Sequence, residues 1–362
     1  MQEVKFNHAS KADFFREINK RVNSYFKDNN ISKYANTEMK IKTVSMLALY
    51  FVPFTLLLTG FATETWMMAL CWSMMGLGMA GIGFGIMHDA NHGAYSKKKW
   101  VNKLLGFTSN FAGVSDMNWR IQHNVLHHMY TNIEGMDDDI AVGFVMRFSP
   151  TQKRLKFHKY QLYYSWFLYG LLTMNWFISK DLKNLKVYDE RGLLKGEKTT
   201  YTAAFIKVLF LKIGYLALTL ALPIYLLPVA WWVTLLLFLL MHFICGLVLS
   251  LVFQPAHVLN ETEFFDVDES GTMENNWAVH QMKTTSDFGQ NSKLLTWFLG
   301  GLNFQVEHHL FRTVCHVHYK KIAKIVEATA KEFEVPYHNH KTFYSALQSH
   351  FSLLDKLGRG VA

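Results

Sequence analysis

Histidines are the residues of this chain whose number and spacing indicate a chemical role. The sequence holds seventeen of them in 362 residues. His88 and His92 lie four residues apart, and in a helix that spacing puts both imidazoles on one face, near enough to bind one metal ion. His123 and His127 repeat the spacing, and His128 follows directly. The pattern predicts a metal site.

Three further histidines extend the set: His308 and His309 in a third cluster, and His257 at the end of an apolar run. Imidazoles without a matching set of cysteines suit iron, zinc or copper rather than calcium or magnesium. Eight are too many for one tetrahedral zinc and about right for two ions that keep open positions. We therefore predict a dinuclear metal site, although each cluster alone could be a helix end carrying histidines for solubility.

Polar residues near these clusters could support the ligands, because a ligating histidine usually donates its second ring N–H to a carboxylate or carbonyl. The candidates for this role or for direct ligation are Asp89, Asp137, Asp139, Glu307, Gln305 and His280. His242 serves as a contrast. It lies fifteen residues before His257 on one apolar run, about 22 Å along a helix. We expect it to be a hydrogen-bonded polar residue between helices.

Four apolar runs are long enough to cross a bilayer, which takes about 20 helical residues. They are Thr43–Gly60, Thr65–Met87, Lys207–Leu227 and Ala230–Phe253. In the third run, Lys207 and Lys212 lie near the start, where their stems could snorkel to the interface. Two shorter stretches, 104–114 and 160–178, are interrupted by polar residues. We interpret them as interfacial or re-entrant helices, with a fifth and a sixth span as the alternative.

The distribution of the basic residues predicts the topology. The links within the first and the second pair of runs contain no Lys or Arg, whereas nine precede Thr43 and many more lie in 88–206 and after Phe253. Positive-inside reasoning puts both termini and the middle segment in the cytoplasm. The net charge is +9, and the basic residues that produce it flank the apolar runs. We therefore interpret them as contacting the membrane surface and expect no nucleic-acid partner.

The predicted fold is all-α and integral to the membrane, with four transmembrane helices in two hairpins and a cytoplasmic helical domain that carries the metal site. The expected segments are a cytoplasmic N-terminal segment (1–42), the first hairpin (43–87), a segment with the first two histidine clusters (88–206), the second hairpin (207–253), a segment with the third cluster (254–319) and an amphipathic C-terminal segment (320–362).

The clusters resemble, in order and separation, the three histidine boxes of membrane fatty-acid desaturases. The matching segments are His88-Asp-Ala-Asn-His92, His123-Asn-Val-Leu-His127-His128 and Gln305-Val-Glu-His308-His309. The third box begins with a glutamine, and in this it resembles the third box of the front-end branch of the family. Front-end enzymes desaturate between an existing double bond and the carboxyl end. The resemblance also implies His257 as an eighth ligand.

This resemblance implies two iron ions, O2 as co-substrate and a cis double bond introduced into a fatty acyl chain. The acyl chain could be linked to CoA, a carrier protein or a membrane lipid. The chain has neither a His-Pro-Gly-Gly motif nor room for a haem domain before Thr43. We therefore expect a separate electron donor, such as a ferredoxin, a cytochrome or a flavoprotein reductase. The expected location is a membrane, with a bacterial inner membrane as the prediction and the active site facing the cytoplasm.

Other functions share parts of this pattern. A di-iron hydroxylase of fatty acyl chains or lipids would use the same oxidant, and Gln305 in the third box favours the desaturase. The same glutamine stands where other branches have histidine, which leaves the number of ligands at that iron open. A zinc hydrolase would need fewer histidines and a general-base carboxylate. A metal transporter should carry polar ligands at mid-membrane depth, where only His242 fits.

Overall fold

The computed structural model describes residues 4–7, 10–267 and 271–361. The outermost residues of the predicted segments 1–42 and 320–362 therefore lie outside the described residues. Four of the helical stretches are long and apolar enough to cross a membrane: Thr37–Leu58, Thr65–Asn91, Tyr201–Leu226 and Trp231–His257. The number of spans agrees with the prediction. The two interrupted stretches, 104–114 and 160–178, are divided among short helices instead.

The elements follow one another along the chain in this order. Before residue 100 they are β1 (Lys5–Phe6), α1 (Ala12–Asp28), α2 (Thr37–Leu58), α3 (Thr65–Gly81), η1 (Ile82–Met87), α4 (His88–Asn91) and α5 (Lys99–Gly106). The middle of the chain forms η2 (Phe107–Ala112), α6 (Asp116–Trp119), η3 (Arg120–His127), α7 (His128–Tyr130), η4 (Lys156–Tyr160), α8 (Gln161–Gly170), α9 (Leu172–Asn175), η5 (Trp176–Lys180), α10 (Asp181–Glu190) and η6 (Leu193–Lys195). The remainder forms α11 (Tyr201–Leu216), η7 (Ala217–Ala221), α12 (Leu222–Leu226), α13 (Trp231–His257), β2 (Thr272–Met273), α14 (Trp277–Thr284), β3 (Ser286–Phe288), α15 (Lys293–Phe298), α16 (Gln305–Leu310), η8 (His316–His318), α17 (Tyr319–Glu332), β4 (His338–His340) and α18 (Phe343–Arg359).

The spanning helices reach further than the apolar runs that predict them. The first begins at Thr37 rather than at Thr43, the second continues past Met87 to Asn91, and the fourth ends at His257. At the ends of the second and fourth helices, the polar residues His88, Asp89 and His257 are buried by the rest of the chain. His88 and His257 therefore lie on the spanning helices themselves, and His92 directly follows the second one.

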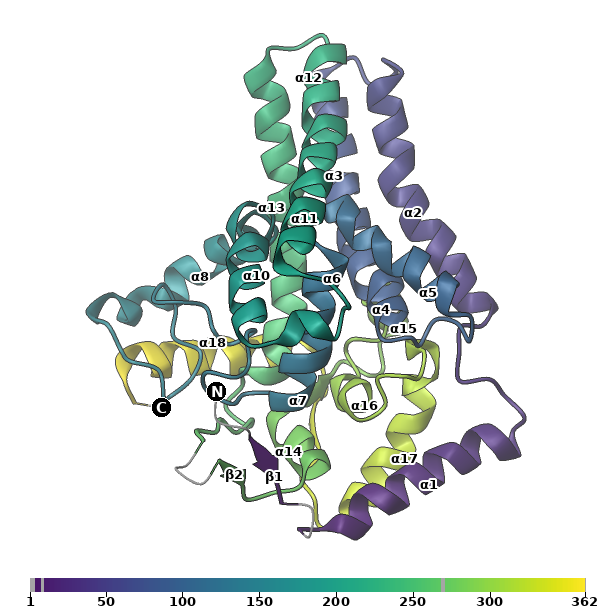
Figure 1. Ribbon diagram of the computed structural model, residues 1–362, viewed down its shortest axis with the longest axis vertical. Coiled ribbons are helices and arrows are strands. Elements are labelled where there is room, and N and C mark those ends of the chain that lie inside the picture. Colours follow the sequence, from purple (N-terminus) through teal and green to yellow (C-terminus); the bar gives the residue numbers. More distant parts are fainter. Residues whose placement is uncertain (1–3, 8–9, 268–270, 362) are drawn as a thin grey trace.

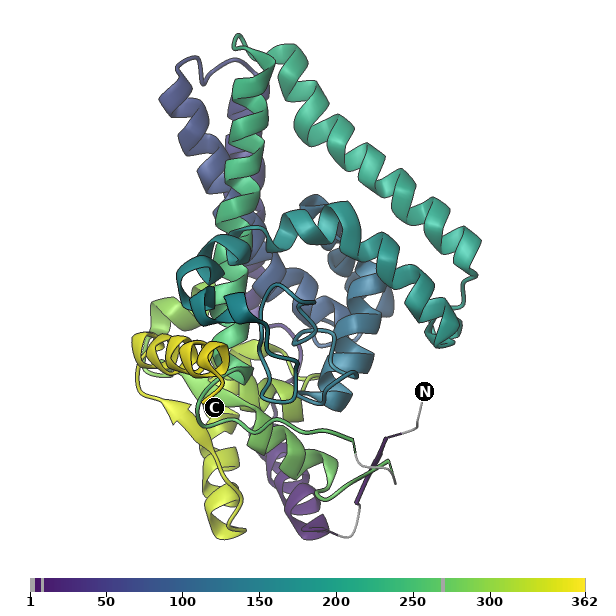
Figure 2. The ribbon, with the colours of Figure 1, turned by 90° about the vertical axis from the view of Figure 1, so that its left-hand side faces the viewer.

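The spanning helices stand together above a body of shorter helices (Figure 1). Helix α3 packs against both α2 and α13, and the largest buried apolar cluster lies there, around Trp72, Met75, Met241 and Cys245. Seen from the side, α11 leans away from the other three spans (Figure 2). The stretch Thr65–Asn91, which contains α3, is the most buried of the four, and Trp231–His257 is the next.

Short parallel strands and one helix pair close the lower body. Strand β3 pairs with β4 in the register Ser286↔His338 to Phe288↔His340, and β1 pairs with β2. Helix α1 packs against α17, with Phe14 against Phe333 and Phe26 against His318. The N-terminal helix thus covers the segment that follows the third histidine cluster, far from the spans (Figure 1).

Candidate metal centre

The eight histidines predicted as ligands come together at the lower ends of the second and fourth spans. All eight are buried. Within 4.8 Å of one another lie ligand atoms of three overlapping groups: His88, His92, His123 and His308; His127, His257 and His309; and His128, His308 and His309. The first two groups share no member, and the third bridges them. This arrangement has the form of two neighbouring metal positions.

The second histidine cluster begins in a π-helix and contributes to more than one group. His123 and His127 lie in the π-helical segment η3, and π-helical turns frequently occur at functional sites. In an α-helix these two residues would face one metal ion. Here His123 and His127 share a group with Asp139, while His123 also joins His88, His92 and His308, and His127 also joins His257 and His309. His123 Nε2 lies 3.2 Å from Nε2 of His128, five residues on.

The outward ring nitrogens of four of these histidines are held by hydrogen bonds. His127 Nδ1 lies 3.1 Å from both carboxylate oxygens of Asp137, as predicted for a supporting carboxylate. The other three donate to residues that the sequence did not single out. Their acceptors are the Thr284 carbonyl for His257 at 3.1 Å, the Tyr319 hydroxyl for His308 at 3.2 Å and Gln281 Oε1 for His309 at 2.7 Å.

The inward nitrogens are left free to bind metal. Nε2 of His257, His308 and His309 is buried without a hydrogen-bond partner among the described residues. Both ring nitrogens of His88 and His92 also lack a partner there, so one nitrogen of each ring can bind metal. Unpaired buried polar atoms are costly unless something binds them. Nitrogen donors of this kind suit iron, zinc or copper, so the residues present fit the predicted pair of iron ions.

Electrostatics keeps most of these rings in the form that binds metal. Burial, reinforced by the neighbouring imidazoles, lowers the pKa of His123, His128, His308 and His309 well below the ordinary value. They are therefore neutral at pH 7, as a ligand must be. Burial also lowers the pKa of His127, but Asp137 and Asp139 outweigh it and raise that pKa to about 9. The carboxylates thus hold a proton on the outer side of this ring.

The remaining candidates lie around the site in different ways. Asp139 Oδ2 is 3.4 Å from His127 Nδ1, and Asp89 Oδ1 is 3.7 Å from His88 Nδ1. Glu307 accepts a hydrogen bond from the Tyr337 hydroxyl at 3.2 Å.

Two candidates flank the groups without joining them. His280 donates from Nε2 to the Thr131 carbonyl at 2.7 Å and belongs to none of the three histidine groups. Gln305 is buried, and its amide nitrogen has no hydrogen-bond partner among the described residues.

Gln281 and Tyr319 are the supporting residues that sequence reasoning missed. Gln281 directly follows His280, and its Oε1 also accepts a hydrogen bond from Thr131 at 2.9 Å. Tyr319 closes the histidine-rich segment after the third cluster. Neither is a carboxylate, and neither lies within one of the three histidine clusters. Their only signal was proximity in the sequence to histidines that were themselves uncertain.

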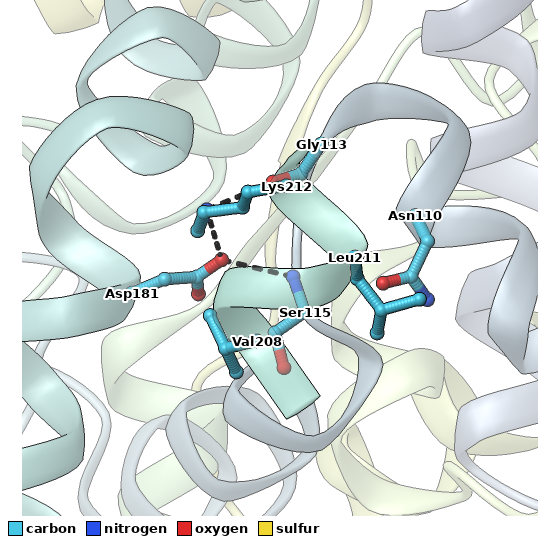
Figure 3. Close-up of a pocket in the computed structure, with 7 residues that line it drawn as sticks. All are labelled: Asn110, Gly113, Ser115, Asp181, Val208, Leu211 and Lys212. Atoms are coloured by element: carbon cyan, nitrogen blue, oxygen red, sulfur yellow. Dashed lines mark hydrogen bonds and ion pairs between the residues drawn. The ribbon is translucent and has the colours of Figure 1, made fainter. Parts of the chain in front are cut away.

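A buried ion pair anchors the second cluster to the third span (Figure 3). Lys212 was expected to snorkel towards the interface, but its Nζ lies 2.8 Å from Asp181 Oδ2 and 3.0 Å from the Gly113 carbonyl. The same carboxylate accepts the backbone N–H of Ser115 at 3.0 Å, and Asn118 donates to the other oxygen at 3.1 Å. Asp181 therefore ties the start of α6, which leads into η3, to α10 and α11.

His242 lies away from the site, as expected. It is fully buried in α13, with Nε2 2.8 Å from the Tyr215 hydroxyl and Nδ1 3.1 Å from Thr173 Oγ1. We predict that replacing His242 with alanine leaves the metal content and the turnover per folded protein unchanged while lowering thermal stability. Metal analysis and turnover of the purified variant would check this, and a folded but inactive His242→Ala protein would contradict it.

Known proteins resemble this chain over nearly its whole length. Residues 64–341 match the family model described as fatty acid desaturase. The sn-1 linoleoyl-lipid 6-desaturase of Arthrospira platensis is 37% identical, with 95% of this chain and 92% of that protein covered. The protein of the same name from Synechocystis sp. is 34% identical, with 99% and 98% covered. An acyl-lipid (8-3)-desaturase of Physcomitrium patens is 35% identical, with 98% and 74% covered.

Proposed function

This chain belongs to the fatty acid desaturase family, and from that premise we propose that it is a front-end desaturase acting on acyl chains esterified in membrane lipids. The observation that carries the proposal is the convergence of eight buried histidines in two groups bridged by His128, His308 and His309. The names of the two cyanobacterial relatives supply the substrate to test first, a linoleoyl-lipid, with the new double bond at carbon 6.

We propose that the eight histidines hold two iron ions, one in each of the two groups that share no member, with His128 of the bridging group between them. With iron bound, this centre supplies an oxidation in which two hydrogens leave adjacent methylenes, O2 is reduced to two waters, and a separate donor protein delivers two electrons, with two protons. The protein's own contribution is orientation and exclusion of water. The outer hydrogen bonds of His127, His257, His308 and His309 set the direction of each ring.

We also propose that the four long helices cross the membrane as two hairpins, with the metal centre and both termini on the cytoplasmic side. The short links inside each pair carry no Lys or Arg, which favours the outer side for them. Helices α4, α7 and α16, which carry six of the eight histidines together with η3, lie at the end of the spans away from these links (Figure 1). An acyl chain in the bilayer would then reach the centre from the membrane side.

Product analysis tests the proposal. We expect that a host supplying linoleoyl lipids and an electron donor, but lacking this activity, gains a fatty acid with a new double bond between carbon 9 and the carboxyl end. Mass spectrometry of the derivatised fatty acids locates the bond, and the His308→Ala chain is the negative control. A double bond on the methyl side would contradict the front-end assignment, and a hydroxylated product would favour a hydroxylase.

A further inference from the structure

Lys42 is a basic residue whose position the apolar pattern does not explain. It precedes the first apolar run and was counted among the basic residues of the cytoplasmic N-terminal segment. In the structure it lies inside α2 and is 2% exposed. Removing an amine from water is costly unless it finds partners. Its partners are Nε2 of His316 at 2.5 Å and the face of Trp297.

Donor and acceptor chemistry gives this contact a direction. The lysine ammonium can only donate, so His316 Nε2 must accept, and the ring proton of His316 must sit on Nδ1. Nδ1 lies 2.8 Å from Asp89 Oδ2, and the backbone N–H of His316 donates to the same oxygen at 3.1 Å. A chain of hydrogen bonds therefore runs from Lys42 through His316 to Asp89.

Asp89, at the end of this series of hydrogen bonds, faces the predicted metal ligand His88. With Oδ2 of Asp89 occupied by His316, Oδ1 is the oxygen that remains, and it lies 3.7 Å from His88 Nδ1. His88 is the counterpart of His127, His308 and His309, whose Nδ1 atoms have outer partners. This distance is too long for a hydrogen bond, and His88 Nδ1 has no partner among the described residues, so Asp89 stands beside the ring without yet bonding to it. Asp89 is itself held by His316, which in turn contacts Lys42.

The same cluster could be taken for a third metal site, because ligand atoms of Asp89, Cys315 and His316 lie within 4.8 Å of one another. Two observations speak against this. Both ring nitrogens of His316 already have partners, and the amine of Lys42 stands where a metal ion would meet a second positive charge. The cluster is built to hold a side chain in place rather than a cation.

Resting on the proposed di-iron function, we propose that Lys42, His316 and Asp89 are positioning residues that orient His88 for iron. With iron bound, the carboxylate would accept the Nδ1–H of His88 after a small approach and so direct Nε2 to the metal shared with His92, His123 and His308. Iron binding at this one position would then depend on a lysine of the first spanning helix. The other group, built on His127, His257 and His309, has its own partners and would be unaffected.

The test loads the purified wild-type protein and its variants with two irons each and compares how tightly they bind them. In Lys42→Met, His316→Ala and Asp89→Asn, we expect one of the two irons to bind about 10–100-fold more weakly, the usual cost of losing an outer partner of a ligand. Titration with an Fe2+ chelator measures this, and Mössbauer spectra should show only one of two iron signals altered. His316→Asn, whose amide N–H can replace Nδ1–H, should restore much of the affinity that His316→Ala loses.

His242→Ala is the matched control, because His242 is equally buried with both ring nitrogens hydrogen-bonded but lies far from the irons. It should keep both irons with the wild-type affinity and spectrum. The inference is overturned if Lys42→Met and both His316 variants bind two irons as the wild type does, or if the wild type binds a third metal ion that these variants lose. A wild-type protein that binds no iron would instead overturn the proposed function on which the inference rests.

Discussion

Replacing His308 with alanine should lower turnover more than about 100-fold, because a direct ligand should matter more than the outer partners whose loss costs 10–100-fold. His308 belongs both to the group around His88 and to the bridging group. Its loss therefore removes a ligand from the metal position at His88 and also disrupts the bridging group that joins the two metal positions. We also expect the iron content to fall from two to one or fewer per chain. Product formation in the linoleoyl-lipid assay and iron analysis of the purified protein measure the two effects.

Single replacements in the separate groups should distinguish the two positions. His92→Ala and His257→Ala should each lose one iron, and the iron that remains should have a different Mössbauer signal in the two variants, because these residues belong to groups without a common member. Retention of both irons and of wild-type turnover in any of these variants would remove that residue from the ligand set.

Replacing Asp181 with alanine should destabilise the protein severely. The Lys212 and Asp181 side chains are 10% and 1% exposed, and removal of one member leaves the other buried without its opposite charge. For buried pairs this lowers the free energy of unfolding by about 3–5 kcal/mol. The loss should appear as a lower melting temperature of the detergent-solubilised protein, with iron lost at the same temperature, because Asp181 also holds Ser115 at the start of the segment that carries His123 and His127.

Two further variants show whether loss of the Lys212–Asp181 ion pair causes the destabilisation expected for Asp181→Ala. The double replacement Asp181→Leu with Lys212→Met should be less destabilising than Asp181→Ala alone, since it leaves no unpaired charge. Glu190→Ala, which breaks the exposed pair with Lys186 on the same helix α10, should leave the melting temperature almost unchanged. Equal losses in Asp181→Ala and in the double variant would show that the lost packing, rather than the unpaired amine, sets the cost.

The number of spans and the identity of the clustered histidines could be predicted from the sequence, because both depend on local properties. A run of apolar residues long enough to cross a bilayer is visible without knowing its neighbours. Histidines such as His88 and His257 could be assigned to one face because they lie at the ends of such runs. Hydropathy also placed His242 correctly away from the site, since position along a helix fixes distance.

The division of the histidines and the identity of their supports depended on the fold. Spacing of four residues placed His123 and His127 together, and they do share a group with Asp139, but each also joins a separate histidine group whose other members come from distant segments. The support of Asp89 comes from His316, 227 residues away. Lys42 and Lys212 look in the sequence like interfacial lysines, and each is buried against a polar partner. Hydropathy reports how a residue interacts with solvent, whereas these partners come from segments that meet only when the helices pack together.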